Sequence, residues 1–302
     1  MFDGFKILLK NSNHILDCNF YVEVNETYSD AVLTKTLYKT KNNITVKYMH
    51  ETDNIYLFGS FHKLKNNGVH NYNQFTYFEF LEQLEYLQYL FRIDLSNCYI
   101  KRLEYGVNIC PPIATKNIHK GLLLHSNETP LNKRKTDFRF KHSKYEIKCY
   151  DKAIQYKLKD DLMRIERNYL YATALHKQGI YTLQDLTNPI HLQYFNNTLL
   201  QDWNNILMYD YTIREKELNT RQRNKLKDYK NPIYWSSLNP RNRHRPKKIL
   251  KEIIISHSDK IQEQIYNQIK STLERNSALN NDIEMHNHFK NTQSNKCIIV
   301  SS

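Results

Sequence analysis

The sequence predicts an α+β protein, in which an antiparallel central sheet with flanking helices is followed by a smaller helical region. Short segments that alternate apolar and polar residues fill the chain up to about residue 170, as half-buried strands do. Helical periodicity follows, without an internal repeat. From residue 276 the chain is rich in Asn, Ser and His, which is typical of disorder. We therefore expect domains at 1–170 and 171–275 and a disordered polar tail at 276–302.

The first third of the chain is expected to supply four strands and one helix. The strands are predicted at Phe5–Leu9, Phe20–Val24, Ile44–Tyr48 and Ile55–His62. Because side chains alternate along a strand, Ser60 and His62 would share one face of the last segment. Asn67-Gly68 marks a turn just before His70. The helix is predicted at Phe75–Phe91, where Phe80, Leu84, Leu87 and Phe91 recur at helical spacing.

The segment Ile100–Ile109 has the clearest strand pattern. Its apolar face would hold Leu103, Tyr105, Val107 and Ile109, and its polar face Arg102, Glu104, Gly106 and Asn108. Pro111-Pro112 ends this strand. Weaker strand patterns follow at Ile118–His125 and Asp137–Phe140, and the segment Leu162–Tyr169 closes this half of the chain.

Helices are expected in the second half. Thr182–Leu186 has the composition of an N-cap and first turn, and Leu199–Met208 is a further helical segment. Pro246 suits the first turn of a long helix, whose apolar stripe runs from Leu250 to Ile269. This half therefore predicts a small helical unit.

Composition and charge narrow the class of partner. The chain has 302 residues, 40% of them hydrophobic, and a formal net charge of +13. That charge favours a polyanion such as nucleic acid over a membrane, because no basic amphipathic helix with a bulky apolar face is evident. The five cysteines are scattered, and neither a signal peptide nor a run of about 20 apolar residues is present. We expect reduced thiols, a cytoplasmic protein and no membrane partner.

The motifs of common small-molecule enzymes are missing from the sequence. No P-loop, G-x-G-x-x-G, C-x-x-C or G-x-S-x-G element occurs. Nucleotide hydrolysis, dinucleotide redox chemistry and serine hydrolysis therefore lack support, and we expect no small-molecule substrate.

The segment Tyr145–Lys152 carries the candidate nucleophile. As a strand it would place Tyr145, Ile147 and Cys149 on an apolar face, and Glu146, Lys148, Tyr150 and Lys152 on the opposite face. Tyr150 would then lie between two ammonium groups, each about 7 Å away. Such cations would favour the phenolate and hold a phosphodiester against it. The alternative is one tyrosine of 23, flanked by solvated lysines.

Three polar strand faces would bring a histidine, a carboxylate and this tyrosine to one side of the sheet. They carry Ser60 with His62, Glu104 with Asn108, and Tyr150 with its lysines. A hard cation binds carboxylate, amide or imidazole ligands and polarises phosphate, so the grouping suits metal-assisted phosphodiester transfer. Gly106 would leave room for a sugar-phosphate backbone. The alternatives are hydrogen-bonded histidines at His62 and His70 and an ion pair at Glu104.

Seven short motifs occur in order over residues 1–275. They are M-F-D-x-x-K, F-G-S-F-H-K, N-N-G-V-H-N-Y-N-x-F, R-L-E-Y-G-V-N-I, I-K-C-Y-D-K-A, L-M-R-I-E-R-N-Y and G-I-Y-T-L-Q-D-L. Together they resemble the rolling-circle replication initiators of filamentous-phage gene II type, including related proteins from phages and plasmids of Bacteroidetes. The resemblance implies a tyrosine nickase related to the His-hydrophobic-His (HUH) endonucleases, with the corresponding sheet.

Such a nickase cuts one strand of origin DNA, keeps the 5′ phosphate on tyrosine and leaves a 3′ hydroxyl. A host polymerase and helicase would be its partners, and the displaced strand would be rejoined later. The resemblance places catalysis on Tyr150 and Lys152 and the Mg²⁺ or Mn²⁺ site near His70 and Glu104. Because this chain has no H-x-H on a strand, His62 and Asn108 join them as candidate ligands. Tyr145 and Tyr156 are candidate second nucleophiles, with Tyr145 on the apolar face.

Lys148 and a basic loop are the candidate DNA-binding positions. The loop cations are Arg241, Arg243, Arg245, Lys247 and Lys248. They would contact the origin duplex near a single-stranded nick site, and plain solubility is the alternative. Two other functions fit the same residues. One is a non-catalytic origin-binding initiator, and the other is a mobilisation relaxase or transposase that uses the same chemistry.

Overall fold

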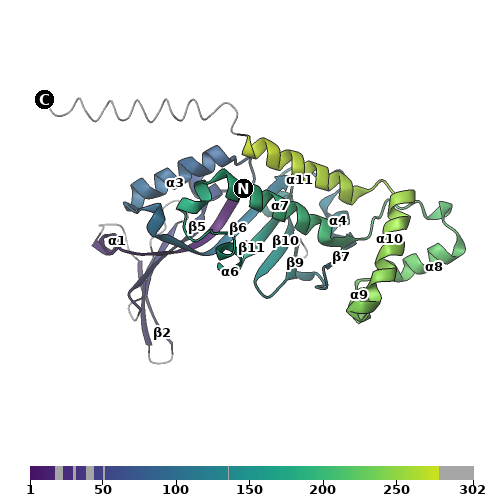
Figure 1. The fold of residues 1–302 in the computed structure, drawn as a ribbon, viewed down its shortest axis with the longest axis horizontal. Helices are drawn as coiled ribbons and strands as arrows, with labels where there is room; N and C mark the ends of the chain where they lie inside the picture. The colour runs from purple at the N-terminus through teal and green to yellow at the C-terminus, as the bar shows by residue number, and fades with distance from the viewer. Residues whose placement is uncertain (18–22, 30–31, 39–43, 50–51, 135, 279–302) are drawn as a thin grey trace.

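A computed structural model describes residues 1–17, 23–29, 32–38, 44–49, 52–134 and 136–278. An eight-stranded antiparallel sheet lies at its centre, which confirms the α+β class (Figure 1). In spatial order its strands are β4 (Thr45–Met49), β5 (Asn54–Ser60), β1 (Phe2–Leu9), β6 (Cys98–Ile109), β11 (Met163–Tyr169), β10 (Tyr145–Asp151), β9 (Asp137–Lys141) and β8 (Leu131–Arg134).

Two smaller pairs of strands accompany the main sheet. The hairpin β2 (Glu23–Ser29) and β3 (Val32–Tyr38) contacts β4 and projects from that end of the molecule (Figure 1). The pair β7 (Leu122–His125) and β12 (Ile206–Met208) lies toward the other end, near the small helical unit.

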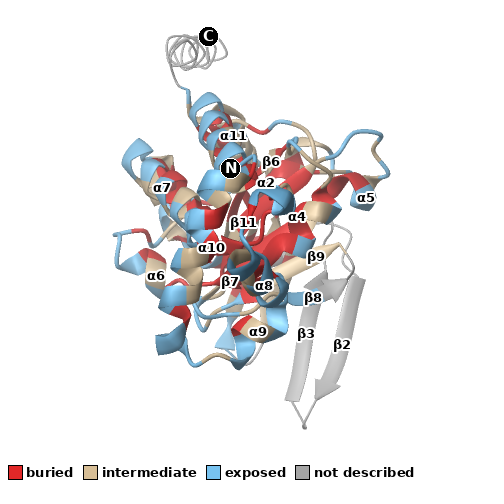
Figure 2. Ribbon diagram, turned by 90° about the vertical axis from the view of Figure 1, so that its right-hand side faces the viewer, coloured by how far each residue is buried: buried red, intermediate tan, exposed pale blue. Residues whose placement is uncertain are grey.

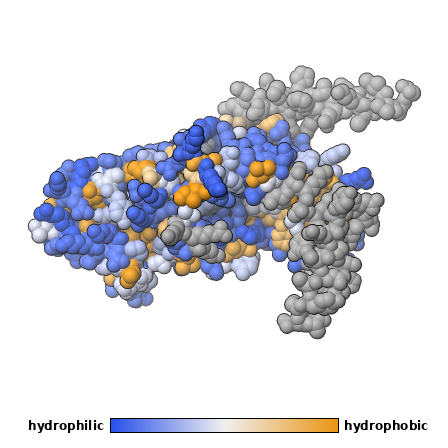
Figure 3. Space-filling view, turned by 180° about the vertical axis from the view of Figure 1, so that it is seen from behind, coloured by the Kyte–Doolittle hydropathy of each residue, from blue (hydrophilic) through white to orange (hydrophobic). Residues whose placement is uncertain are grey.

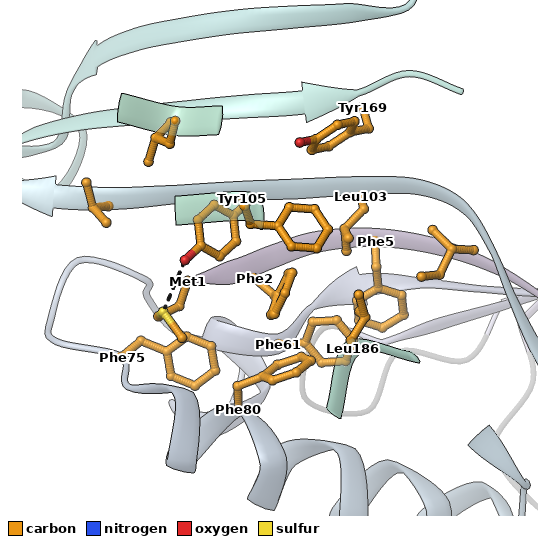
Figure 4. Packing of buried hydrophobic residues seen from close by; sticks show 14 of the residues in the cluster. Met1, Phe2, Phe5, Phe61, Phe75, Phe80, Leu103, Tyr105, Tyr169 and Leu186 are labelled. Carbon is orange, nitrogen blue, oxygen red and sulfur yellow. Dashed lines mark hydrogen bonds between the residues drawn. The ribbon is translucent and has the colours of Figure 1, made fainter. Parts of the chain in front are cut away.

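Three long helices cover one face of the sheet. They are α3 (Tyr77–Phe91), α7 (Pro189–Asn205) and α11 (Ile261–Ser277). In the core between sheet and helices, the Phe2 ring centre lies 4.6 Å from that of Phe80 and 5.0 Å from that of Tyr105 (Figure 4). Thr76 and Glu79 form a capping box at the start of α3, which explains why this helix begins where it does.

A second, smaller core belongs to α8 (Thr220–Tyr229), α9 (Pro232–Ser237) and α10 (His244–His257). It surrounds the fully buried Trp235, whose indole N–H donates to the carbonyl of Tyr229 at 2.7 Å. The two cores do not divide at residue 170, because α7 and α11 pack on the sheet. Figure 2 shows buried residues along the sheet and exposed residues on the outer sides of the helices.

In the part of the chain that the structure describes, five short α-helices connect the larger elements. They are α1 (His14–Asp17), α2 (Phe61–Lys65), α4 (Thr115–Gly121), α5 (Lys152–Tyr156) and α6 (Thr173–His176). Within the ranges described above, no helix is both long and apolar enough to cross a membrane.

The strand predicted at Ile55–His62 ends two residues early, so the placement of His62 on a strand is wrong. Ser60 is the N-cap of α2, and its side chain accepts a hydrogen bond from the backbone N–H of Lys63 at 3.1 Å. Capping by a serine competes with continuation of the strand. His62 therefore lies on a helix.

The long helix predicted from Pro246 to Ile269 is broken. It ends at His257 as α10, and α11 begins at Ile261. Asp210 stabilises the turn between α10 and α11. Its carboxylate accepts hydrogen bonds from the Ser258 hydroxyl at 3.0 Å and from the Ile261 N–H at 2.9 Å. The apolar period continues across the break, which is why the sequence pattern conceals it.

Other boundaries also differ from expectation. Ile118–His125 starts as helix α4 and only then becomes β7, and Leu199–Met208 is the end of α7 followed by β12. Thr182–Leu186 leads into a 3₁₀ turn at Gln184–Thr187, and α7 begins at Pro189. Most of Phe20–Val24 and nearly all of the predicted tail lie outside the described residues.

Candidate functional site

The polar face of the central strands carries a buried ionic network. Arg164 and Glu166 lie on β11 and Asp3 on β1, and each is at most 2% exposed. The Arg164 guanidinium lies 2.6 Å from the Glu166 carboxylate and 2.9 Å from that of Asp3. Burial raises the pKa of Asp3, but opposing contributions, of which the charge of Arg164 is the largest, together hold that pKa below its ordinary value. Removing one partner would leave a buried charge unpaired.

Tyr150 faces this network from β10, while Ile147 and Cys149 of the same strand lie in the core, as the strand pattern predicted. Its hydroxyl donates to Glu166 Oε2 at 3.1 Å. Burial, and then the charge of Glu166, raise the pKa of Tyr150 well above its ordinary value. The expectation that cations favour the phenolate is wrong here, because the hydroxyl of the partly buried Tyr150 donates to a carboxylate.

Lys148 is part of the same network. Its ammonium donates to Glu104 Oε1 at 2.7 Å and to Glu166 Oε1 at 2.8 Å. Burial lowers the pKa of Lys148, but the two carboxylates together raise it by more. The pKa is therefore above its ordinary value, and the side chain stays charged. Its charge is balanced inside the protein, so Lys148 is not the free phosphate contact that we expected.

Lys152 lies close to Tyr150 but not on its strand. β10 ends at Asp151, whose side chain caps α5 by accepting from the Ile154 N–H at 2.9 Å, and Lys152 is the first helical residue. The Lys152 ammonium lies 5.0 Å from the centre of the Tyr150 ring and donates to the side-chain oxygen of Asn71. Burial and then the charge of Arg164 lower the pKa of Lys152 to about 7.

The two predicted histidine ligands lie on α2 and in the loop after it. His62 is 2% exposed, and its Nε2 is 2.7 Å from Asn73 Oδ1. Burial lowers the pKa of His62 to about 3, so its ring is neutral at physiological pH. His70 stacks on Tyr72, with ring centres 4.1 Å apart. Neither histidine is paired with Glu104.

Glu104 and Asn108 occupy the predicted polar face of β6. Glu104 accepts from Lys148 and, at 2.6 Å, from Arg102. The Asn108 amide donates to the Tyr72 carbonyl at 3.0 Å, and its oxygen accepts from Arg164 at 3.1 Å. One carboxylate oxygen of Glu104 and the amide oxygen of Asn108 are therefore engaged by cationic side chains.

The four predicted metal ligands do not converge. His62 and Asn108 line one cavity of about 140 Å³, whereas Glu104 lines other hollows with Tyr150. Within the described part of the chain, no three His, Cys, Asp or Glu side chains are grouped to hold a metal ion. The cations Arg164 and Lys148 lie among the carboxylates instead. The arrangement does not fit a Mg²⁺ or Mn²⁺ site.

Two hollows flank Tyr150. The β1 hollow has a volume of about 400 Å³ and is lined by residues that include Lys6, Phe58, Lys63, Arg102, Glu104 and Tyr150. The β9 hollow has a volume of about 570 Å³ and is lined by residues that include Asp137, Arg139, Lys148, Tyr150 and Gln155. Tyr150 borders both, so a chain-like ligand could pass it from one to the other.

No family model and no curated protein matches this chain. The likeness to replication initiators therefore rests on the motifs, and the function rests on the site itself. That site contains four residues that the sequence reasoning missed: Asp3, Asn71, Arg164 and Glu166. The alternation of Met163 and Ile165 with Arg164 and Glu166 is a detectable strand signal, but nothing local indicates that Asp3 reaches the same cluster.

Gly106 does not make room for a nucleic-acid backbone. A Cβ at this position would lie 2.4 Å from the Ile165 carbonyl oxygen and 2.4 Å from Glu166 Cβ. The glycine is therefore needed for the close approach of β11, which places Glu166 beneath Tyr150.

The two candidate second tyrosines lie on opposite sides of the sheet. Tyr145 lies on the apolar side, as predicted, with the Arg167 guanidinium 3.6 Å from its ring centre. Tyr156 lies on the side of Tyr150, where its hydroxyl donates to Asn71 Oδ1 at 2.8 Å. Tyr156 is thus the better placed of the two.

The predicted basic loop is a 3₁₀ turn followed by the start of α10. Arg243 is only 5% exposed, and it donates to the carbonyls of Leu238 at 3.0 Å and Asn127 at 3.1 Å. Lys247 donates to the Ser126 carbonyl at 3.1 Å. Both cations thus contact backbone within the protein, and Arg243 is too buried to face DNA. Lys247 is half-buried, and its contact with DNA stays a prediction. The other three, Arg241, Arg245 and Lys248, are exposed.

Proposed function

We propose that the protein is a sequence-specific single-strand DNA endonuclease and ligase that initiates rolling-circle replication of a phage or plasmid. The order of the motifs and the charge of +13 support this function. The observation that carries it is the position of Tyr150, which borders two hollows on the polar sheet face next to Lys152. The antiparallel sheet is compatible with the HUH-endonuclease fold, which is part of the proposal.

In the proposed reaction the Tyr150 oxygen attacks a phosphodiester phosphorus. A tyrosine–phosphate bond forms, the bond from phosphorus to the 3′ oxygen breaks, and the 5′ phosphate stays on the protein. The phenol proton needs an acceptor. Glu166 is a weak one, because Lys148 and Arg164 hold its pKa well below the ordinary value despite its burial.

Lys152 is the better acceptor. With a pKa of about 7, a large fraction of Lys152 is neutral at physiological pH and can take the proton from the phenol. The resulting ammonium then donates that proton to the departing 3′ oxygen. Rejoining follows the reverse path, with the 3′ hydroxyl as nucleophile and Tyr150 as leaving group.

Cations at the β1 hollow would hold the phosphate. Lys63 and Arg102 line it, and Arg102 is 45% exposed at its side chain. Because the predicted metal ligands do not converge, each step is assigned to the protein's own side chains. Arg241, Arg245 and Lys248 are the exposed positions proposed to contact nearby duplex DNA.

The test is a search for a covalent adduct. Single-stranded oligonucleotides that tile the intergenic DNA of the encoding phage or plasmid are incubated with the protein, with Mg²⁺, with Mn²⁺ or with EDTA. We expect an oligonucleotide linked to the peptide that contains Tyr150. Tyr150→Phe should bind DNA but form no adduct, whereas Tyr145→Phe, on the opposite face, should still form it. An adduct in Tyr150→Phe would rule out the assignment.

A non-catalytic origin-binding initiator is the second candidate. The raised pKa of Tyr150 favours it, because a raised pKa opposes phenolate formation. The pairing of Glu166 with lysine and arginine also favours it, because those cations make the carboxylate a weaker proton acceptor. This function predicts binding that weakens steeply with salt and no adduct under any condition. A relaxase or transposase would form the adduct, and a circularisation assay during synthesis separates that role from replication.

A further inference from the structure

The polar sheet face continues beyond Tyr150 onto β6, β1, β5 and β4. Two rows of cross-strand partners lie there: Thr45, Phe58, Lys6 and Arg102 in one row, and Lys47, Tyr56, Leu8 and Tyr99 in the other. Directly opposed residues of an antiparallel pair project to the same side. Aromatic rings and cations are therefore interleaved on one side of the sheet.

Lys6 contacts an aromatic ring in each of the two rows. The Lys6 ammonium lies 4.6 Å from the Tyr56 ring centre and 5.2 Å from that of Phe58. Both rings are partly exposed, and Tyr99 is 38% exposed. A sheet face with accessible rings offers a stacking surface to a planar ligand.

Positive charge accumulates at the same place. Burial and then the neighbouring charges of Lys47, Lys101 and Arg102 lower the pKa of Lys6. The neighbouring charges that lower the pKa of Lys6 are thus all cations. An anionic ligand would relieve this repulsion, so the surface favours binding of a polyanion.

This surface leads to Tyr150. Phe58, Lys6 and Arg102 line the β1 hollow together with Tyr150. Phe58 on β5 and Tyr150 on β10 are four strands apart in the sheet order, which corresponds to about 19 Å at ~4.8 Å per strand. Figure 3, which views the molecule from behind, shows a largely hydrophilic surface with separate hydrophobic patches.

We propose that Lys6, Lys47, Tyr56, Phe58 and Tyr99 form an aromatic platform that binds unpaired bases of a single-stranded nucleic acid and directs the strand to Tyr150. Single-strand binding proteins stack bases on aromatic side chains and hold the backbone with cations. The faces of unpaired bases are free to stack, unlike those within a duplex. The direction toward Tyr150 rests on the proposed function, whereas binding by the platform does not.

Fluorescence anisotropy tests the platform in the Tyr150→Phe background, in which no cleavage is expected. The probe is a labelled oligothymidylate of about 16 nucleotides, the upper end of common single-fold site sizes. Tyr56→Ala should weaken binding about 5- to 100-fold, and Tyr56→Phe, which keeps the ring, should restore it. Lys6→Ala should reduce the slope of log K against log salt by about 0.7.

Tyr89→Ala is the matched control, because Tyr89 is 81% exposed on α3, which covers the other face of the sheet. The affinity of the Tyr89→Ala variant for the oligonucleotide should equal that of the Tyr150→Phe protein. Urea unfolding verifies that each variant is folded. Unchanged binding in Tyr56→Ala, or an equal loss in Tyr89→Ala, overturns the platform. Binding to phosphatidylserine vesicles that is stronger than binding to the oligonucleotide also overturns it.

Further measurements distinguish DNA from RNA as the ligand, and they distinguish failure of the platform from failure of the nicking reaction. Oligouridylate in place of oligothymidylate tells RNA from DNA, and preferential binding of either supports the platform. An adduct in the wild-type protein with unchanged binding in Tyr56→Ala refutes the platform and leaves nicking intact. Lost binding in Tyr56→Ala with no adduct in the wild-type protein supports the platform and refutes nicking.

Discussion

Replacing the buried Lys152 with methionine should change how the stability of the protein depends on pH. Lys152 is 1% exposed, and its pKa is lowered from 10.5 to about 7 by burial and by Arg164. Methionine keeps a flexible chain of similar length without the charge. Asn71 Oδ1 retains a donor in the variant, because the Tyr156 hydroxyl also donates to it.

The magnitude follows from proton linkage. Unfolding returns the pKa of Lys152 from about 7 to 10.5, so between these values the unfolded chain binds more protons than the folded protein. The stability contributed by neutral Lys152 is therefore fully present above pH 10.5 and is lost as pH falls toward 7, by up to about 1.4 kcal/mol per pH unit. From pH 7 to pH 9 the gain integrates to about 2 kcal/mol.

Urea unfolding at pH 7 and pH 9 measures this difference. The wild-type free energy of unfolding should rise by about 2 kcal/mol more than that of Lys152→Met over this interval. Lys270→Met, which removes an exposed lysine from α11, should behave like the wild-type protein. Parallel pH dependence in wild type and Lys152→Met would refute a neutral Lys152 near pH 7, and with it the proton transfer proposed for the reaction.

Three further predictions use the same unfolding assay. The free energy of unfolding of Gly106→Ala should be about 1–3 kcal/mol lower than that of the wild-type protein, because the added Cβ would lie 2.4 Å from a backbone carbonyl oxygen. Wild-type stability of this variant would contradict the prediction. Arg164→Met should lower the free energy of unfolding by about 3–5 kcal/mol, since it leaves two buried carboxylates without their shared cation. Arg243→Ala should lower the free energy of unfolding by about 2–4 kcal/mol, because it removes the hydrogen bonds to two carbonyls. Replacement of the exposed Arg241 by alanine should change the free energy of unfolding by no more than about 0.5 kcal/mol. The Arg241→Ala variant should instead bind duplex DNA more weakly in a salt titration. Equal effects at these two arginines would remove the distinction between a structural and a DNA-facing position.

Local periodicity determined the strands that hold the site. In β6 and β10 the alternation of apolar and polar residues correctly assigned each side chain to a face, including Glu104 and Tyr150. This succeeds because the period of a strand is set by backbone geometry that every residue shares. The capping box at Thr76 and the apolar spacing likewise determined α3.

Local pattern failed where a side chain competes with the backbone for hydrogen bonds. Ser60 and Asp151 each cap a short helix, and these caps moved His62 and Lys152 off the strands on which the alternation had placed them. Asp210 broke the long helix in the same way, from a position far away in the sequence.

The sequence by itself thus determined the α+β class, the antiparallel strands and which face of β6 and β10 is polar. Only the tertiary structure decided that Asp3, Arg164 and Glu166 meet beneath Tyr150, and that Lys152 lies over its ring. The reason is that strand faces follow from neighbouring residues, whereas burial and charge pairing depend on residues from distant parts of the chain. The protonation of Tyr150 and Lys152 is set by burial and those distant charges, so it could not be read from the order of the residues.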